Sequence, residues 1–407
     1  MSLLNPNTPG VKINELRLGA PPIFGVGTST AGFVGVAPKS DRFVGAARLV
    51  TSADQFTSDY IFAAPGDETR DKTKDATRST DLSRAVLGFF ANGGGTCYVV
   101  NVDSTNAAQL VNNVNAGLAL FQVIDEIAII AAPGQTDPAV YTTLEDQAKT
   151  SRNRFAILDP PAKVANLSTL ITPSTIPNPT ARPGDSIHAA FYYPRILVGP
   201  QVAGGKLLSG DPRSEAASPS GHVAGVYARV DASRGVHKAP ANEQVLGALG
   251  VEHLLTDEDQ NAVNKQGVNL LRMFSGNTVI WGGRTLQANG NSIDPDYAYV
   301  STRRLVSFVE ESLRQGLRFA VFEPNNLSLR QQIIRSARGF LNGVWRDGAL
   351  FGATADEAFY VRFPDIFNTD ADRAAGKLTV EIGLRVTFPA EFIIVRIGVI
   401  LENATTA

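Results

Sequence analysis

Two glycine-flanked segments contain the residue types of a nucleophilic enzyme. Ser29 lies in the sequence GTSTA (residues 27–31), and His222 lies in GHVAG (residues 221–225). A serine becomes a nucleophile when a histidine base within hydrogen-bond reach takes its proton and a carboxylate orients that histidine. The two segments therefore raise the hypothesis of a Ser/His hydrolase.

The chain order speaks against this hypothesis. GTSTA resembles the nucleophile segment of subtilisin-type proteases, and GHVAG resembles their histidine segment. In those enzymes the triad runs Asp, His, Ser, whereas Ser29 precedes His222 by roughly 200 residues and no suitable Asp segment comes before His222. The alternative is a glycine-rich turn with a buried or capping histidine, and we predict no catalytic residues.

Metal and phosphate chemistry find no better support. The other three histidines lie far apart in the sequence and Cys97 is the single cysteine, so no metal-ligand spacing is present. The sequence GPQVAGGK (residues 199–206) approaches a phosphate loop, but its spacing is off by one and Leu207 stands where Ser or Thr must hold magnesium. We therefore expect no cofactor and no metal.

The composition narrows the class of protein. The chain has 407 residues, enough for two or three domains at roughly 150 residues each, and 43% of them are hydrophobic against 19% charged. A formal net charge of -2 does not suit a protein that wraps nucleic acid by charge, and one cysteine excludes a disulfide scaffold. The apolar runs are shorter than the ~20 residues of a spanning helix, and residues 1–20 do not read as a secretory signal. We expect synthesis in a reducing compartment and no membrane insertion.

The elements that would position any site alternate between strand and helix. Short apolar strands separated by amphipathic helices indicate a mostly parallel sheet covered on both faces. Polar or proline-rich segments at 66–81 and 159–186 read as surface loops, and Asp81 reads as a helix N-cap. The predicted strands are 32–38, 97–100, 127–130, 154–158 and 191–198, and the predicted helices are 82–90 and 138–150.

The C-terminal third has a different pattern. An apolar stripe predicts a helix over 302–315, and a second helix over 328–342 is expected to close at Gly343. The strands predicted around these helices are 317–322, 359–363, 377–388 and 392–400.

Both ends of the chain have strand character outside the main pattern. Apolar and polar residues alternate around Val11 and Ile13, between prolines, and residues 392–400 are too hydrophobic for an exposed sheet edge. A lone terminal strand must pair with some sheet. Each could belong to the chain's own sheet or reach another molecule.

The order of several blocks resembles the contractile-tail sheath family. The matching blocks are spread over nearly the whole chain and keep their order, which is more specific than any one motif. They are TPGV (8–11), GFVGVAP (32–38), FFANGG (89–94) with YVV (98–100), SGHVAGVYARVD (220–231), VSTRRL (300–305), FEPN (322–325), and GFL (339–341) with Trp345 and GAL (348–350).

The resemblance implies a fold and a domain order. The fold would be α/β, with a subtilisin-like, mostly parallel sheet core, an α+β C-terminal domain, and extended N- and C-terminal strand arms. GHVAG would then be a decoy without protease activity. The implied domains are an N-terminal arm (1–22), a sheath core with surface loops (23–270), a C-terminal domain facing an inner tube (271–388) and a C-terminal arm (389–407).

The resemblance also implies a function. Sheath subunits stack as hexameric rings around an inner tube, exchange arm strands with neighbours, and contract from a metastable extended state to drive the tube through a target envelope. The implied partners are further copies of the chain, an inner tube protein, a baseplate, a tail terminator or cap, and paralogous sheath chains, without nucleic acid. Assembly would take place in the bacterial cytoplasm, giving a phage tail or tail-like particle.

Candidate residues follow from this interpretation. The alternatives are a non-contractile self-assembling shell or tube protein and, less favoured, a subtilisin-like hydrolase. We expect the arm anchors to be Val11, Ile13, Phe392, Ile394 and Val399, the acceptor strands to carry Tyr360, Val361, Val380, Ile382, Leu384 and Val386, and the inner tube to contact Arg330, Arg335 and Arg338.

Overall fold

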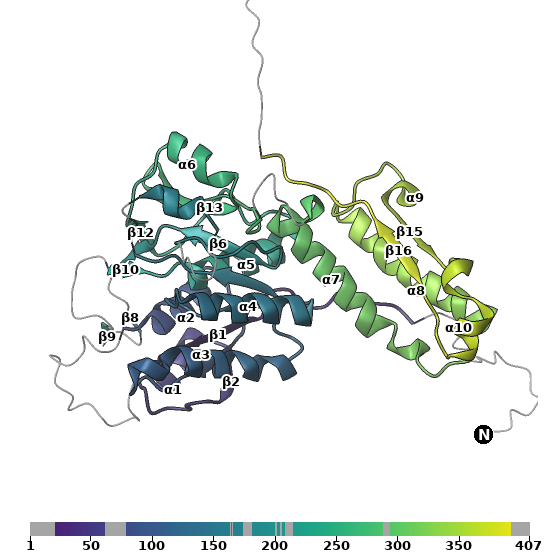
Figure 1. Cartoon of the computed structure of the whole chain (residues 1–407), viewed down its shortest axis with the longest axis horizontal. Helices are drawn as coiled ribbons and strands as arrows, with labels where there is room; N and C mark the ends of the chain where they lie inside the picture. Colours follow the sequence, from purple (N-terminus) through teal and green to yellow (C-terminus); the bar gives the residue numbers. More distant parts are fainter. Residues whose placement is uncertain are drawn as a thin grey trace, which may run out of the picture.

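A computed structural model of the chain places a nine-stranded sheet at its centre (Figure 1). The strand order is β11-β14-β13-β6-β5-β4-β1-β3-β2, and the six strands from β13 to β3 run parallel, as predicted. The strands are β1 (Ala31–Gly35), β2 (Ala47–Val50), β3 (Cys97–Asn101), β4 (Ile129–Ala131), β5 (Phe155–Leu158), β6 (Ala189–Tyr193), β11 (Glu243–Gln244), β13 (Val268–Phe274) and β14 (Asn277–Trp281). The structure describes residues 21–61, 79–162, 164, 166–173, 181–199, 202–203, 206–207, 215–287 and 294–391.

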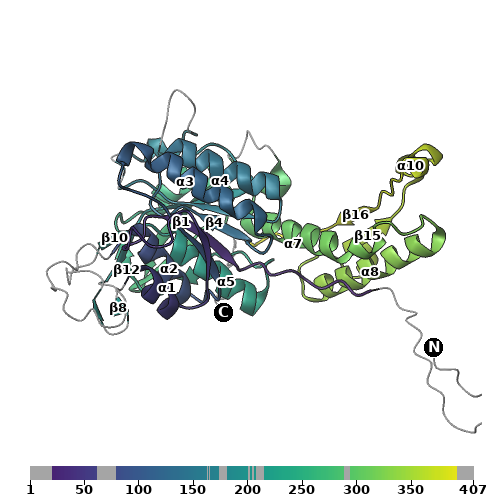
Figure 2. The same cartoon turned by 90° about the horizontal axis from the view of Figure 1, so that it is seen from below.

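Helices cover both faces of this sheet (Figure 2). One apolar cluster joins the sheet to α1, α2 and α5, and a second joins its other face to α3 and α4. Because both faces are buried, the central strands are apolar throughout rather than alternating. The helices around the sheet are α1 (Ala53–Tyr60), α2 (Asp81–Ala91), α3 (Leu110–Ala119), α4 (Pro138–Ser151), α5 (Ser220–Arg234) and α6 (Asp257–Asn264).

Two expectations about this region need correction. The cap of α2 is Thr80, whose side chain accepts from the backbone N–H of Ser83, while Asp81 is the first helical residue. The apolar run 191–198 forms two strands, because β6 ends at Tyr193 and β7 (Ile196–Val198) joins a separate antiparallel sheet. That sheet contains β10 (Glu215–Ala217) and β12 (Ala248–Val251) beside β7, and β8 (Val202–Ala203) pairs with β9 (Lys206–Leu207).

A smaller unit follows the sheet in the sequence and lies beside it in space (Figure 1). The sheet continues through β14 to Trp281, so residue 270, the expected domain boundary, falls inside β13. The long helix α7 leads from the sheet into the smaller unit, where an apolar cluster joins α7, α8 and two strands. Its elements are α7 (Val300–Gly316), α8 (Leu327–Arg346), α9 (Ala355–Ala358), β15 (Phe359–Arg362), α10 (Asp370–Ala374) and β16 (Glu381–Leu384).

The smaller unit differs from the prediction at two places. Residues 317–322 form a short 3-10 turn over Arg318–Ala320 instead of a strand, because they only connect α7 to α8 and pair with no described sheet. Helix α8 runs through Gly343 and ends at Arg346, and Gly348 takes the positive φ of 80° at its end. A glycine does follow the helix, as predicted, but it is Gly348 and not Gly343.

Candidate assembly site

The two-stranded sheet of the smaller unit has an open edge. β15 and β16 pair antiparallel, with Tyr360 opposite Gly383 and Val361 opposite Ile382, and no other described strand pairs with either. Just after β16, the backbone of Arg385 still bonds toward the β15 side, because its N–H donates to the carbonyl of Ala358 at 2.8 Å. Because bonding direction alternates along a strand, the N–H and C=O groups of Ile382, Leu384 and Val386 point to the free edge.

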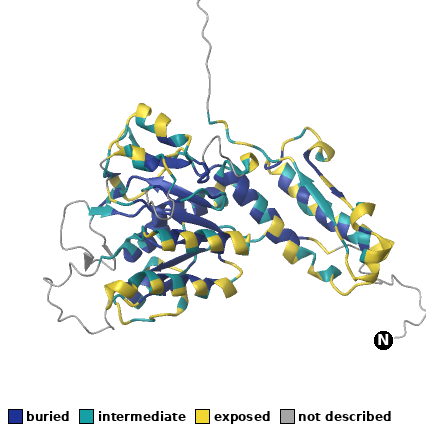
Figure 3. Cartoon of the chain, viewed as in Figure 1, coloured by how far each residue is buried: buried dark blue, intermediate teal, exposed yellow. Residues whose placement is uncertain are grey.

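An apolar groove of about 470 Å³ lies between this open edge and α7. Strand β16 is half-buried, as its intermediate colour in Figure 3 shows, so the apolar surface beside it is accessible. An extended segment laid in the groove would gain backbone hydrogen bonds from β16 and apolar contacts from α7. The groove is lined by Asp296, Tyr297, Thr302, Val306, Val309, Glu310, Leu313, Ile382, Leu384, Arg385, Val386 and Phe388.

The structure brings most of the predicted acceptor residues to this site. Ile382, Leu384 and Val386 line the groove, and Val380 packs against the apolar cluster of the smaller unit. Val361 lies in that cluster too. Tyr360 points to the outside, where its ring covers Gly383 and its hydroxyl donates to Glu381 at 2.7 Å. The contribution of α7 to the groove was not predicted, although its apolar stripe through Val306, Val309 and Leu313 is visible in the sequence. The predicted arm anchors lie outside the described residues.

Two of the three predicted tube-contact arginines contact the chain's own side chains. Arg338 donates to Asp356 at 2.5 Å and lies over the ring of Phe359. Arg330 lies over the ring of Phe363. Both guanidinium groups therefore contact the chain's own β15 region, while Arg335 is exposed on α8.

Ser29 and His222, the two residues of the hydrolase hypothesis, lie apart in the structure. His222 lies in the first turn of α5, buried against Gly88 of α2, while Thr28, next to Ser29, donates to Asp231 near the other end of α5. His222 and Asp231 are nine positions apart on α5, or about 14 Å at 1.5 Å per residue. GHVAG is helical rather than a turn. Ser29 and His222 therefore do not form a nucleophile–base pair.

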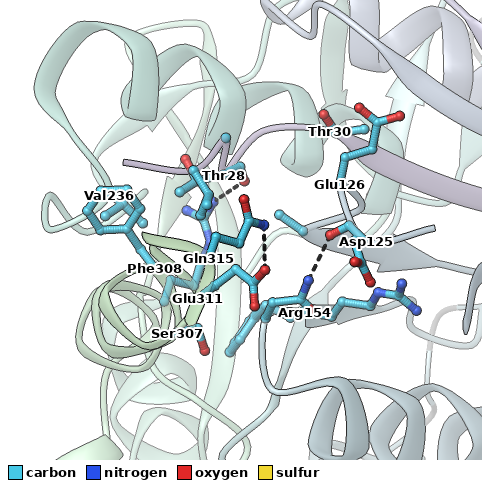
Figure 4. A pocket seen from close by; sticks show the side chains of 16 residues that line it. Thr28, Thr30, Asp125, Glu126, Arg154, Val236, Ser307, Phe308, Glu311 and Gln315 are labelled. Carbon is cyan, nitrogen blue, oxygen red and sulfur yellow. Dashed lines mark hydrogen bonds between the residues drawn. The ribbon is translucent and has the colours of Figure 1, made fainter. Parts of the chain in front are cut away.

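A second cavity, of about 290 Å³, lies where α7 meets the sheet (Figure 4). Thr28, Thr30, Arg154 and Glu311 line it. Arg154 donates to the backbone carbonyls of three residues of the preceding loop, Phe121, Ile124 and Ile127. The role of Arg154 is therefore structural, since it holds this loop against β5.

Beside this cavity, α5 and α7 are joined by a buried ion pair. Arg304 donates to both carboxylate oxygens of Asp231, at 2.9 and 2.6 Å, and both side chains are about 5% exposed. Thr28 completes the junction by donating to Asp231 and accepting from Arg304. Burial alone would lower the pKa of Arg304, but the charge and hydrogen bonds of Asp231 raise it above its ordinary value. The junction ties the smaller unit to the sheet.

Comparisons with known proteins agree with this architecture. Residues 114–286 match the phage tail sheath protein central domain, and residues 292–400 match the phage tail sheath C-terminal domain. Together these models cover well over half of the chain, from the sheet through the smaller unit. The chain belongs to the contractile tail sheath family.

Particular relatives can be named. The chain is 30% identical over 179 residues to the tail sheath protein of Burkholderia phage BcepMu, a match that spans 42% of this chain and 36% of that protein. Its structure is similar to the contracted PVC sheath of an extracellular contractile injection system (TM-score 0.74, 26% identity, 97% and 98% of the two chains). It is also similar to the contracted helical sheath of the anti-feeding prophage (TM-score 0.71, 27% identity, 96% and 98%).

The described residues lack two other kinds of site. In them, no helix is long and apolar enough to cross a membrane. Among the same residues, no group of three or more His, Cys, Asp or Glu side chains is arranged to hold a metal ion.

Proposed function

We propose that this chain is a non-enzymatic sheath subunit that polymerises as stacked hexameric rings around an inner tube. Its N-terminal (1–22) and C-terminal (389–407) arms add strands to the β15–β16 sheets of neighbouring copies, and the lattice contracts from a metastable extended state to drive the tube through a target envelope. The particle is a phage tail or tail-like device assembled in the bacterial cytoplasm. The observation that carries the proposal is the open β16 edge beside an apolar groove.

The energetics favour many weak joints over one strong joint. Four or five added backbone hydrogen bonds contribute about 1 kcal/mol each, while ordering an arm costs about 1–2 kcal/mol per residue. Apolar side chains buried in the groove, at about 1.5–3 kcal/mol each, tip the balance. Two arms per subunit in a closed lattice then hold together through high effective concentration.

Partners follow from the same arrangement. Chains similar to this one occur in the anti-feeding prophage baseplate in two structures, which supports contact with a baseplate. A terminator or cap and paralogous sheath chains are proposed as further partners. For the inner tube, we now place the contact at Arg335, since Arg330 and Arg338 are held against β15.

Electron microscopy of the purified chain tests the proposal. We expect striated hollow cylinders from the full chain and soluble particles from a chain without residues 1–18. A Val306→Arg variant puts a charge on the groove wall at a half-buried position and should also stay soluble. Val123→Arg, at a position 87% exposed and outside the groove, is the matched control and should form cylinders. A full chain that remains a small closed oligomer at high concentration overturns the proposal.

The tube contact is tested separately. Arg335→Glu should weaken co-sedimentation with inner tubes, whereas Arg338→Glu, at a position that pairs with Asp356 and lies over Phe359, should bind them nearly as wild type does. Equal binding by wild type and Arg335→Glu would show that the tube contact is elsewhere.

A further inference from the structure

The connector to the C-terminal arm is fastened to the main sheet unit by one side chain. The carboxylate of Glu391 accepts from Arg284 at 2.6, 3.0 and 3.1 Å, from Asn264 at 2.7 Å and from Tyr299 at 2.9 Å. These partners come from the end of α6, the segment after β14 and the N-cap of α7. Burial alone would raise the pKa of Glu391, but the hydrogen bonds from Arg284 and Asn264 lower it below its ordinary value. Glu391, called the clamp from here on, is therefore charged at neutral pH.

The sequence around the clamp has the pattern of a β-hairpin. Residues 377–388 and 392–400 are two strand-like runs, and only Pro389, Ala390 and Glu391 separate them. A three-residue loop between two such runs is a common hairpin connection, and short loops close at little entropic cost. By pattern alone, the arm would fold back on the open β16 edge of its own chain.

The structure takes the connector in another direction. After β16, the N–H of Thr387 donates to the carbonyl of Ala349, the ring of Phe388 lies 6.4 Å from that of Tyr299, and Glu391 reaches Arg284. The described chain therefore ends beside the sheet unit, away from the β15–β16 pair (Figure 1). Pro389 adds to this, because the residue before a proline is held extended.

We propose that Glu391 is a positioning residue that keeps the C-terminal strand off the β16 edge of its own chain. The strand and the edge then both stay free to pair with a second copy. The inference rests on the proposed strand exchange, since intramolecular and intermolecular pairing would use the same edge and the same arm. Intramolecular pairing needs no partner and would win at low concentration. Holding the connector straight removes that competitor before assembly begins.

Hydrogen–deuterium exchange on monomers tests the inference. In wild-type monomers, the N–H groups of Ile382, Leu384 and Val386 should exchange fast, because they face a free edge. In Glu391→Ala monomers they should be protected by the chain's own arm, and the concentration needed for polymerisation should rise about tenfold or more. Removing residues 392–407 from the Glu391→Ala chain should abolish the protection.

Two further variants separate positioning from stability. Asp356→Ala removes an exposed carboxylate that also pairs with an arginine, Arg338 of α8 rather than a residue of the sheet unit, and should behave as wild type. Inserting about six flexible residues after Glu391 keeps the clamp but gives the arm slack to turn back, so it should also protect the β16 edge. This insertion tests the inference even if Glu391→Ala lowers the melting temperature.

The outcomes separate the two proposals. Unprotected β16 amides in monomers of both Glu391→Ala and the insertion variant, with assembly as in wild type, overturn the clamp inference alone. If the wild-type chain forms the same cylinders with and without residues 392–407, exchange of the C-terminal strand itself is wrong.

Discussion

Single buried side chains determine how the smaller unit joins the sheet. Arg304 and Asp231 are both nearly inaccessible, each carries the charge that balances the other, and Thr28 adds a hydrogen bond to each. Arg304 also lies 4.7 Å from the centre of the Tyr227 ring. Removing one partner of a buried pair leaves an uncompensated charge in a low-dielectric environment, which costs more than the intact pair contributes.

We expect Asp231→Asn to lower the free energy of unfolding by about 3–5 kcal/mol, because Arg304 would remain buried without a counter-charge. Urea unfolding followed by circular dichroism measures this. Arg373→Ala, which removes a pair on the exposed helix α10, should leave the unfolding midpoint nearly unchanged. Equal midpoints for wild type and Asp231→Asn would show that the pair is not a structural junction.

His222 should make the fold sensitive to acid. Burial lowers its pKa from 6.5 to about 4, so the unfolded chain binds a proton in this interval that the folded chain does not. Stability is therefore unaffected by His222 above pH 6.5 and falls as pH drops from 6.5 to 4, by about 2 kcal/mol at pH 5.

Comparing His222→Leu with wild type isolates this effect from other titrating groups. The difference in unfolding free energy between variant and wild type should shift toward the variant by about 2 kcal/mol between pH 7 and pH 5. A difference independent of pH would mean that the pKa of His222 is the same in the folded and the unfolded chain.

At the scale of elements, GHVAG is a helix-packing motif. Gly221 and Gly225 lie one turn apart on α5, and a Cβ at either would approach the backbone of α2 to 2.2 or 2.4 Å. On α2, a Cβ at Gly88 would lie 2.3 Å from the ring of His222. The glycines that resembled a catalytic segment therefore let two helices touch.

The same substitution should have opposite effects on two helices. Gly221→Ala should destabilise the monomer by at least about 1–3 kcal/mol, because rigid backbone blocks the added methyl group. Gly339→Ala on α8, where nothing lies within 4 Å of an added Cβ, should stabilise it by up to about 1 kcal/mol through helix propensity. Thermal unfolding of the two variants measures both effects. Destabilisation by Gly339→Ala would contradict the open space around this position.

At the scale of the whole molecule, residues 21–28 link the two units. Pro21 accepts from Ser336 of α8, Val26 donates to Ser312 of α7, and Thr28 reaches Asp231 of α5. Ile23 is 8% exposed and belongs to the apolar cluster of the smaller unit. This segment is part of the fold, so Pro21, at the end of the proposed N-terminal arm, is anchored to its own chain.

Two deletions should therefore differ sharply. Removing residues 1–18 should leave the melting temperature of the monomer unchanged, while removing residues 1–28 should lower stability by about 2–5 kcal/mol through the loss of Ile23 alone. Differential scanning calorimetry of both truncations measures the effect. A stable monomer without residues 21–28 would show that the segment only lies on the surface.

Local patterns in the sequence determined much of this protein. The apolar strands, the stripe of α7 and the parallel sheet followed from periodicity, because burial on one or both faces leaves a direct trace in the sequence. Such patterns do not tell which sheet a strand joins. The run 191–198 therefore divided between two sheets, and residues 317–322, apolar but only connecting two helices, formed no strand.

Only the tertiary structure decided which distant residues meet. The groove needs α7 beside β16, the junction needs Thr28 between α5 and α7, and the clamp needs Glu391 beside Arg284, all separated by tens to hundreds of residues. Their sequence neighbourhoods are ordinary, since a charged residue reads the same whether solvated or paired across the fold. Long-range packing therefore determined the open edge and the direction of the connector, on which assembly is proposed to depend.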